Sequence, residues 1–282
     1  MEEKKKLNII AITDFSEYGE TAVRHGAILA TIFKASLTII TDFSFSSADK
    51  KNEKSFHSVD SIHFLNDLDV FHDHHLELFV LSDHFYPKKL FDYAEESNTT
   101  MLVIGVEKNG KNTFFSRKKA VQFIKPSRIP VMTVGNITPE PTVYQHVILP
   151  LDIDRQAKEK SLWAGYFSRF YCATVHILYT TYKDAFLKKK LKDNIDFTEK
   201  LYHNLEIQYQ LHNIVPTVDN IDKYSLQYAS QIEASLTVIM MTQYYSLVDY
   251  LLGPKEYAVI GNKAGFPVLC INERDDLYVL CT

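Results

Sequence analysis

The chain has 282 residues, and 46% of them are hydrophobic, which is enough for packed cores and too many for a disordered chain. The formal net charge of −4 argues against a general nucleic-acid-binding protein, because such proteins carry a strongly basic face. The odd cysteine count of 3 argues against a disulfide framework, and no stretch approaches the ~18 consecutive apolar residues of a membrane span. The N-terminal segment also lacks the features of a signal peptide. We therefore expect a cytoplasmic protein with neither nucleic-acid nor membrane partners.

The first half begins with an apolar strand at 7–12, an acidic turn that contains Asp14, an amphipathic helix and a second apolar strand from residue 36. A further strand is expected at 75–81 and a helix at 86–97. The half closes with the apolar strand "TMLVI" at 100–104, a long loop, an amphipathic helix and the strand "IPVMTV" at 129–134. Short strands that alternate with helices indicate crossover connections and a parallel sheet covered on both faces.

The second half repeats this order. "YQHVILPLDIDRQAKEKSLWAGYFSRFYCATVHILYT" again reads as strand, acidic turn, helix and strand, and "LTVIMMTQYYSLVDYLLGPKEYAVIGNKAGFPVLCIN" closes the half as before, again with an amphipathic helix before its last strand. Between these segments we expect a strand at 205–211 and a helix at 218–234. The repeat predicts domains at 1–138 and 142–282, which meet at prolines that cannot extend a strand ladder.

Aromatic side chains recur at helical spacing in the second half's first helix. They are Trp163, Tyr166, Phe167 and Phe170, and we expect them to face the core. The lysine-rich segment at 182–205 is predicted to be a helix with one buried stripe, although a partner surface is the alternative.

These features resemble the universal stress protein family in its tandem two-domain form. "IIAITDFSEYGETAVRHGAILA" resembles the family's first strand, Asp turn and first helix, and "IPVMTV" and "FPVLCI" resemble its closing strand. The second half is similar to tandem members from Bacteroidetes-type bacteria. The resemblance implies a five-stranded, Rossmann-like parallel α/β unit per repeat, similar to the adenine-nucleotide alpha-hydrolase-like fold. It also implies pairing of the two units through their last strands, 129–134 and 267–272, with a homodimer and a protein partner as further expectations.

Many family members bind ATP or a related nucleotide through a G-x2-G-x9-G-[ST] loop. Its glycines let backbone N–H groups approach phosphate oxygens, and the acidic residue after the first strand contacts the base or ribose. The resemblance places Asp14 at the acidic position and Gly105 at the first glycine. Lys108 falls on the second glycine position, for which Gly110 could substitute, and Arg117 and Lys118 fall on the final Gly-Ser pair.

In the second half, the resemblance places Asp152 at the acidic position and Met241 at the first glycine. Gly253 is the glycine that survives from the final pair, and Pro254 after it has no backbone N–H. Neither loop fits the family pattern. If any nucleotide binds, ATP or AMP is expected.

Each candidate residue has a structural alternative. Asp14 could form a capping box with Glu17, Ser16 could cap the helix instead, or Asp14 could contact a ligand. Asp152 could contact a ligand, while Asp154 is expected to cap the next helix. Lys108 and Lys118 could bind phosphate through their charge or point into water.

Metal and catalytic sites are not expected. The residues His72, Asp73, His74, His75 and His84 are of metal-binding types, but their spacing fits no standard zinc pattern. No nucleophile motif is present, and the cysteines lie in apolar contexts without an adjacent histidine. The sequence therefore favours a non-enzymatic stress-response or signalling protein with degenerate nucleotide loops. The alternatives are an ATP or AMP sensor that uses the first domain only and, less favoured, a weak nucleotide hydrolase.

Overall fold

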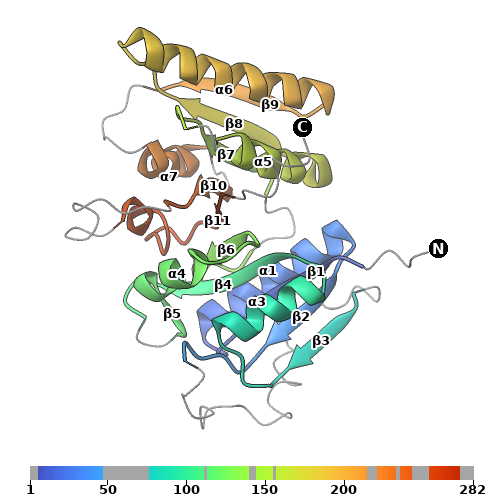
Figure 1. Ribbon diagram of the computed structural model, residues 1–282. Coiled ribbons are helices and arrows are strands. Elements are labelled where there is room, and N and C mark those ends of the chain that lie inside the picture. Colours follow the sequence, from blue (N-terminus) through green and yellow to red (C-terminus); the bar gives the residue numbers. More distant parts are fainter. Residues whose placement is uncertain are drawn as a thin grey trace. The chain divides into compact units, whose positions relative to one another are not determined.

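The computed structural model describes residues 6–46, 76–110, 113–139, 144–154, 157–214, 221–232, 236–242 and 254–273. The chain divides into two compact units, Met1–Pro141 (unit 1) and Thr142–Thr282 (unit 2). Each unit combines a parallel sheet with helices (Figure 1), so the predicted α/β, Rossmann-like fold class is confirmed. In the described part of the chain, no helix is both long and apolar enough to cross a membrane.

The sheet of unit 1 is built from short apolar strands that all run in the same direction. Their order across the described sheet is β3 (Leu78–Leu81), β2 (Ser36–Ile40), β1 (Asn8–Ile12), β4 (Thr99–Glu107) and β6 (Val131–Val134). Every residue of β1 and β2 is buried. Strands buried on both faces are expected where crossover helices cover both sides of a parallel sheet.

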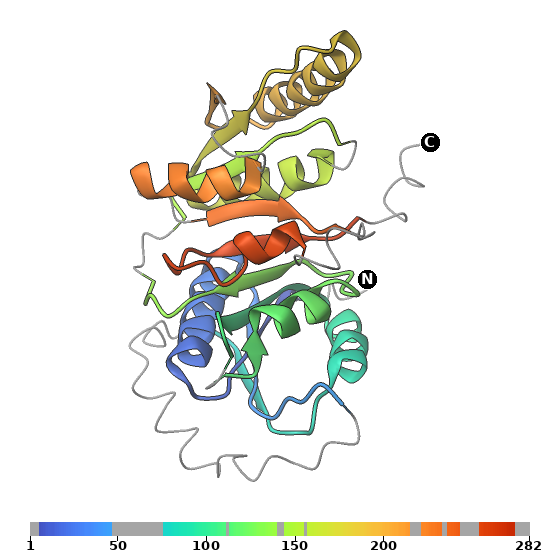
Figure 2. The same cartoon turned by 90° about the vertical axis from the view of Figure 1, so that its left-hand side faces the viewer.

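The helices of unit 1 provide this cover. Those in the described residues are α1 (Glu17–Phe33), α3 (Pro87–Glu96) and α4 (Arg117–Ile124), and Figure 2 shows α1 and α3 on opposite sides of the sheet. The hydroxyl of Ser16 caps α1 by accepting a hydrogen bond from the backbone N–H of Gly19 at 3.2 Å. α1 ends at Lys34, whose left-handed φ of 53° stops the helix.

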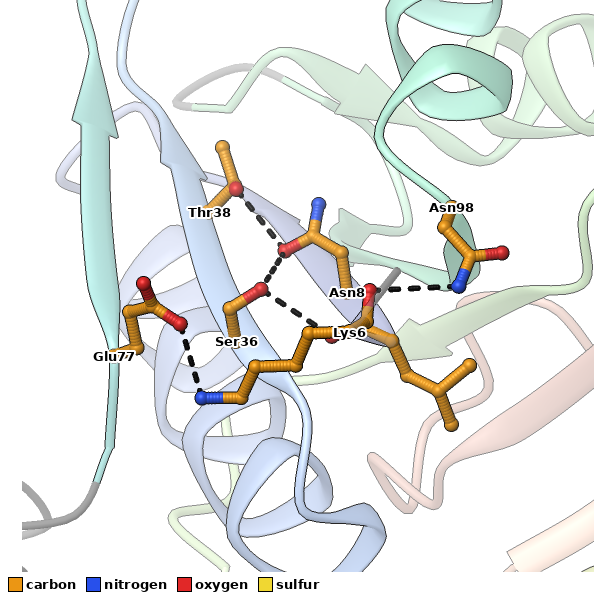
Figure 3. A network of polar contacts seen from close by, with 7 residues as sticks. Lys6, Asn8, Ser36, Thr38, Glu77 and Asn98 are labelled. Atoms are coloured by element: carbon orange, nitrogen blue, oxygen red, sulfur yellow. Dashed lines mark hydrogen bonds and ion pairs between the residues drawn. The ribbon is translucent and has the colours of Figure 1, made fainter. Parts of the chain in front are cut away.

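A polar network fastens the amino ends of the central strands of unit 1 (Figure 3). The side-chain oxygen of Asn8 on β1 accepts hydrogen bonds from the hydroxyls of Ser36 and Thr38 on β2, both at 3.1 Å. Its amide nitrogen donates to the hydroxyl of Thr99 on β4 at 3.1 Å. Because Asn8 is only 3% exposed, these bonds satisfy a polar side chain that would otherwise be costly to bury.

Unit 2 has the same strand order in its described part. Its parallel strands follow one another as β11 (Val268–Ile271), β10 (Leu236–Met240), β7 (His146–Pro150), β8 (Thr174–Tyr179) and β9 (Tyr209–Asn213). The α-helices among its described residues are α5 (Ala157–Tyr171), α6 (Ala185–Asn204) and α7 (Ile221–Gln231). In each unit, therefore, the first strand of the repeat lies at the centre, with the second and third strands on one side and the fourth and last on the other.

The helix expected before the last strand of unit 2 differs from the prediction. The described residues there form η2 (Lys255–Ala258), a 3-10 helix of 4 residues, in place of an amphipathic α-helix. Gly261 and Gly265 after it have φ values of 61° and 67°, which an α-helix cannot contain. The side chain of Asn262 closes the turn, since its amide nitrogen donates to the carbonyl of Phe266 at 2.9 Å.

The prediction that all the aromatic residues of α5 face the core was wrong. Phe167 is fully buried, but Tyr166 is 49% exposed and Phe170 is 46% exposed. Small residues such as Ala164 and Gly165 form part of the buried face, and Gly165 allows the ring of Tyr202 on α6 to approach closely. α6 itself has the predicted single buried stripe of Leu191, Asn194, Thr198 and Tyr202.

Candidate functional site

Asp14 follows β1 directly and lies at the carboxyl edge of unit 1, the edge at which the parallel strands end. One carboxylate oxygen accepts hydrogen bonds from the backbone N–H of Ser16 at 3.1 Å and from its hydroxyl at 2.5 Å. The other oxygen accepts a hydrogen bond from the backbone N–H of Phe114 at 2.6 Å. Hydrogen bonds to a charged acceptor are stronger than neutral ones. Asp14 therefore fixes the turn before α1 and also holds the loop between β4 and α4.

Of the three roles considered for this turn, the structure assigns the N-cap to Ser16. Glu17 does not complete a capping box, because its carboxylate accepts a hydrogen bond from the side chain of Asn136 at 3.4 Å. Asp14 contributes indirectly, because it accepts a hydrogen bond from the Ser16 hydroxyl and so orients the group that caps the helix.

The loop that follows β4 is packed down on the sheet by aromatic side chains. We call Phe43, Phe45, Phe114, Phe115 and Phe123 the aromatic cluster. Phe115 is only 1% exposed, and its ring centroid lies 5.2 Å from that of Phe43, 5.5 Å from that of Phe45 and 5.2 Å from that of Phe123. Phe115 also begins the short strand β5 (Phe115–Ser116), which pairs with the end of β4. The buried ring of Phe115 thus holds this loop against the rest of unit 1.

Steric contacts explain why Gly105 and Gly110 of this loop are glycines. A Cβ atom at Gly105 would lie well inside van der Waals contact with the backbone carbonyl of Tyr18 on α1. Gly110 has a left-handed φ of 61°, and a Cβ there would overlap Ser116. Both glycines are required by the fold of the loop, whether or not the loop meets a phosphate.

The described lysines of this loop and of the first turn of α4 are exposed. Lys108 and Lys118, which fall on positions expected to be small, are both exposed. The ammonium group of Lys119 lies 5.0 Å from the ring centroid of Phe45, over the aromatic cluster.

At the carboxyl edge of unit 2, Asp152 follows β7 as Asp14 follows β1. Its carboxylate lies 3.6 Å from the ammonium group of Lys160, a side chain that is almost completely buried. It also accepts a hydrogen bond from the backbone N–H of Asp154 at 3.2 Å. The side chain of Asn194 on α6 donates to the backbone carbonyls of Asp152 and Asp154 at 2.8 and 2.9 Å. Asp152 is therefore fixed by protein groups.

Glu256 occupies the neighbouring position at this edge. The residue is 1% exposed, and one of its oxygens accepts a hydrogen bond from the backbone N–H of Thr242 at 2.6 Å. Thr242 follows Met241, the position expected for the first loop glycine. A carboxylate of the protein thus receives a backbone N–H at the point where a phosphate-binding loop would begin.

The surroundings of Glu256 are rich in negative charge. Burial raises the pKa of the Asp222 carboxyl, an effect that the nearby Lys160 and Lys255 oppose. Burial acts to lower the pKa of Lys255, but the carboxylates of Asp222, Glu256 and Asp152 outweigh it, so the pKa is raised.

Two predictions fall outside the described residues. Gly253 is one, so its proposed place in a loop is not observed. The histidine-rich stretch at 72–75 is the other, whereas His84 is described and contacts Asp42 at 3.3 Å. Within the described ranges, no group of three or more His, Cys, Asp or Glu side chains is arranged to hold a metal ion.

Sequence reasoning overlooked the polar group formed by Asp42, Ser44 and His84 at the ends of β2 and β3. His84 had been considered only as a metal ligand. The available signal was the alternation in "DFSF" at 42–45, which in an extended segment directs Asp42 and Ser44 to one side and both phenylalanines to the other.

Comparisons with known proteins identify the fold. No protein-family model matches the chain, and no curated protein is similar to it at the sequence level. A universal stress protein from Archaeoglobus fulgidus has a similar structure, with a TM-score of 0.65 and 12% identity over 95% of this chain and 97% of that one.

Two proteins from Pseudomonas aeruginosa are also similar. One, of unknown function, has a TM-score of 0.59, and the other, described as a universal stress protein, has a TM-score of 0.58. Each is 10% identical and covers 97% of this chain and 95% of its own. At these identities the similarity establishes the fold.

Proposed function

We propose that this chain is a non-enzymatic stress-response or signalling protein of the universal stress type, in which the nucleotide loops of both halves are degenerate. The observation that carries the proposal is the hydrogen bond from the Phe114 N–H to Asp14 at 2.6 Å. It engages the acidic residue that the resemblance assigns to a nucleotide, and it holds the loop closed over the sheet. On this reading the tandem domains at 1–138 and 142–282 act through partners.

The contacts of the loop indicate how strongly it disfavours a nucleotide. A ligand that used Asp14 would replace the Phe114 hydrogen bond, and a hydrogen bond to a charged group contributes about 1.5–3 kcal/mol. If it also displaced the buried ring of Phe115, it would lose packing on the order of 3 kcal/mol. Together these costs correspond to a Kd weaker by roughly 10³-fold or more, which would bring a micromolar site to the millimolar range.

Unit 2 disfavours nucleotide binding for an electrostatic reason. Glu256 already accepts the Thr242 N–H at 2.6 Å, and this buried carboxylate repels an incoming phosphate. Lys160 is paired with Asp152 at 3.6 Å, so its charge is already balanced by the protein.

The proposal is tested by titrating ATP, ADP and AMP into the full chain by isothermal calorimetry, with and without Mg²⁺. We expect no binding at micromolar nucleotide. The alternative sensor, which would use the first domain only, predicts micromolar binding of ATP or AMP that weakens at least tenfold in a Lys108→Ala/Lys118→Ala double variant. Lys189→Ala, which removes an exposed lysine of α6, is the matched control and should not change the result in either case. Micromolar binding by the wild type would overturn the proposal.

We also propose that the two domains pair within one chain through their last strands. β6 and β11 each stand at one end of the strand order of their unit, and both consist of apolar residues apart from Thr133 in β6. Such a strand is a poor edge to leave open to water. Hydrogen exchange of the full chain tests this pairing, because paired strands should protect the amides of both β6 and β11. Fast exchange at the outward-facing amides of either strand would refute it, and the dependence of that protection on concentration would show whether a homodimer provides it instead.

A cytoplasmic location forms part of the same proposal. The described cysteines Cys172 and Cys270 are both free thiols, as expected in a reducing compartment. Fractionation of the native host would test it, and enrichment outside the cytoplasm would contradict it.

A further inference from the structure

The segment that follows β2 is held against the segment that follows β3 by backbone hydrogen bonds. The N–H of Phe85 donates to the carbonyl of Asp42 at 3.0 Å, and the N–H of Ser44 donates to the carbonyl of Phe85 at 2.9 Å. Phe43 and Phe85 form a parallel bridge between these contacts. The two segments therefore have a fixed register, and His84 is placed opposite Asp42 and Ser44.

The alternation of side chains separates an apolar side from a polar side. Phe43 and Phe45 pack in the aromatic cluster, where their ring centroids lie 5.3 Å apart. Asp42 and Ser44, which alternate with them, point to His84. This arrangement follows from an extended backbone in which successive side chains leave on opposite sides.

The polar side contains a chain of hydrogen-bonding groups in the order carboxylate, imidazole and hydroxyl. Asp42 Oδ1 lies 3.3 Å from His84 Nδ1, and His84 Nε2 lies 3.1 Å from Ser44 Oγ. A histidine that contacts a serine hydroxyl through one nitrogen and a carboxylate through the other is the arrangement that activates serine nucleophiles on unrelated folds. It is recognised by geometry and not by sequence position.

The exposed fraction increases from Asp42 through Ser44 to His84. Asp42 is 2% exposed and Ser44 is 9% exposed, while the His84 side chain keeps 19% of its surface accessible. The second oxygen of Asp42 is buried and accepts no hydrogen bond from the described residues. A buried carboxylate oxygen without a partner is costly for stability, so packing alone does not explain why an aspartate stands here.

We propose that Ser44 is an activated nucleophile that accepts an acyl group from an activated ester, with His84 as general base and Asp42 as the positioning residue. This goes beyond the proposed function, since it assigns to unit 1 a covalent modification in which no nucleotide takes part.

The hydroxyl of Ser44 has one proton and two acceptors. The carbonyl of Ser46 lies 2.7 Å from Ser44 Oγ, and His84 Nε2 lies 3.1 Å from it. When the imidazole is protonated, Nε2 donates to Ser44 and the hydroxyl donates to Ser46. When the imidazole is neutral with its hydrogen on Nδ1, that hydrogen is donated to Asp42, and Nε2 is free to accept the hydroxyl proton.

The transfer step then balances. Ser44 Oγ attacks the ester carbonyl carbon as its proton passes to His84 Nε2, and the carbonyl π electrons move onto oxygen. When this electron pair returns, the bond to the leaving oxygen breaks, and the departing alcohol takes the proton from Nε2. The products are an acyl ester on Ser44 and a free alcohol, with His84 neutral again.

The test is acylation of the full chain by p-nitrophenyl acetate, followed by release of nitrophenol and by peptide mass spectrometry. We expect one acetyl group per chain, located on Ser44. The charged groups that contact this site in the described residues are Asp42 and Lys89, whose ammonium group donates to the His84 carbonyl at 3.0 Å.

Variants assign the roles. Ser44→Ala should lose the modification, and His84→Ala should slow it by about 10²-fold, as expected for removal of a general base. Asp42→Asn should slow acylation and also abolish the downfield Nδ1 proton resonance of an imidazole that is hydrogen-bonded to a carboxylate. Ser82→Ala removes an exposed serine from the same segment and is the control that should label as the wild type does.

The proposal is overturned if Ser44 is not acetylated in the wild-type chain, or if Ser82 and other exposed serines react as fast as Ser44. It is also overturned if His84→Ala labels at the wild-type rate while circular dichroism shows that the variant is folded. None of these results bears on the calorimetric test of nucleotide binding.

Discussion

Acid is expected to destabilise unit 1 through a single buried histidine. His25 on α1 is 2% exposed, and its burial lowers the pKa from 6.5 to about 3. The folded unit therefore keeps His25 neutral at pH values where the unfolded chain binds a proton. Because the pKa is lower in the folded state, this contribution to stability is present above pH 6.5 and is lost as the pH falls toward 3.

The size of the effect follows from the shift. Each pH unit within this window costs about 1.4 kcal/mol per proton taken up on unfolding. Between pH 7 and pH 5 the loss is about 2 kcal/mol, because the first half unit lies above the pKa of the unfolded chain. Most carboxylates titrate below this range, so the interval is dominated by histidines.

Urea unfolding at pH 7 and pH 5 measures this loss. A hydrogen-exchange pulse at one fixed pH, read by mass spectrometry of peptides from α1 and β1, reports on unit 1 by itself. His25→Leu and His25→Gln remove the titrating group with an apolar and a polar replacement. We expect the wild type to lose about 2 kcal/mol more than either variant between the two pH values. Equal losses in all three proteins would refute the assignment, even if both variants are less stable overall.

Further predictions concern three other buried positions. Burial, together with the neighbouring His146 and His212, lowers the pKa of His176 to about 4. The free energy of unfolding of unit 2 should therefore fall by about 1–2 kcal/mol between pH 6.5 and 4, after allowance for solvent screening. Urea unfolding followed by the fluorescence of Trp163 measures this loss, and an unchanged urea midpoint would contradict it. Gly105→Ala should cost about 3 kcal/mol of unit 1 stability, because its Cβ would overlap the backbone carbonyl of Tyr18. Gly165→Ala should cost less, about 1 kcal/mol, because its Cβ would meet only side chains, Ile207 at 3.0 Å and Tyr202 at 3.3 Å, which can move by a few tenths of an ångström. Equal effects in urea unfolding would show that the Gly105 backbone can shift. Asn8→Ala should lower the free energy of unfolding by about 2–3 kcal/mol, because it removes the hydrogen bonds of a buried side chain. Lys6→Ala removes only an exposed ion pair with Glu77 and should lower it by less than about 0.5 kcal/mol. A reversed order in urea unfolding would contradict the role given to the network in Figure 3.

The fold could be predicted because its determinants are local in the sequence. Short apolar runs bounded by polar turns mark the strands, and Pro130 and Pro267 mark the start of the last strand in each half. The helix before β11 was mispredicted because apolar spacing over a few residues does not distinguish an α-helix from a 3-10 turn. There, Gly261 and Gly265 adopt left-handed backbone angles that end any helix.

The site was harder to predict because its contacts are distant and involve backbone donors. The partner of Asp14 is the N–H of Phe114, which is 100 residues away and carries no side-chain signature. Glu256 lay in a segment expected to be an ordinary helix, so its contact with Thr242 was not foreseen. The exposure of Tyr166 follows from the close packing of Gly165 on α5 against Tyr202 on α6, which helical spacing alone does not reveal.

At the carboxyl edge of each unit, a carboxylate of the protein accepts a hydrogen bond from a backbone N–H. In unit 1 a loop N–H donates to Asp14, and in unit 2 the N–H of Thr242 donates to Glu256. A carboxylate attached to the chain competes with a dissolved phosphate at a high effective concentration and at no cost of association. Once a side chain accepts the loop N–H, the backbone need not approach a phosphate closely, and the requirement for glycine is relaxed. On the proposed function, bulky residues such as Lys108 and Met241 can then occupy positions that a phosphate-binding loop reserves for glycine, and the sequence and the internal hydrogen bonds have one explanation.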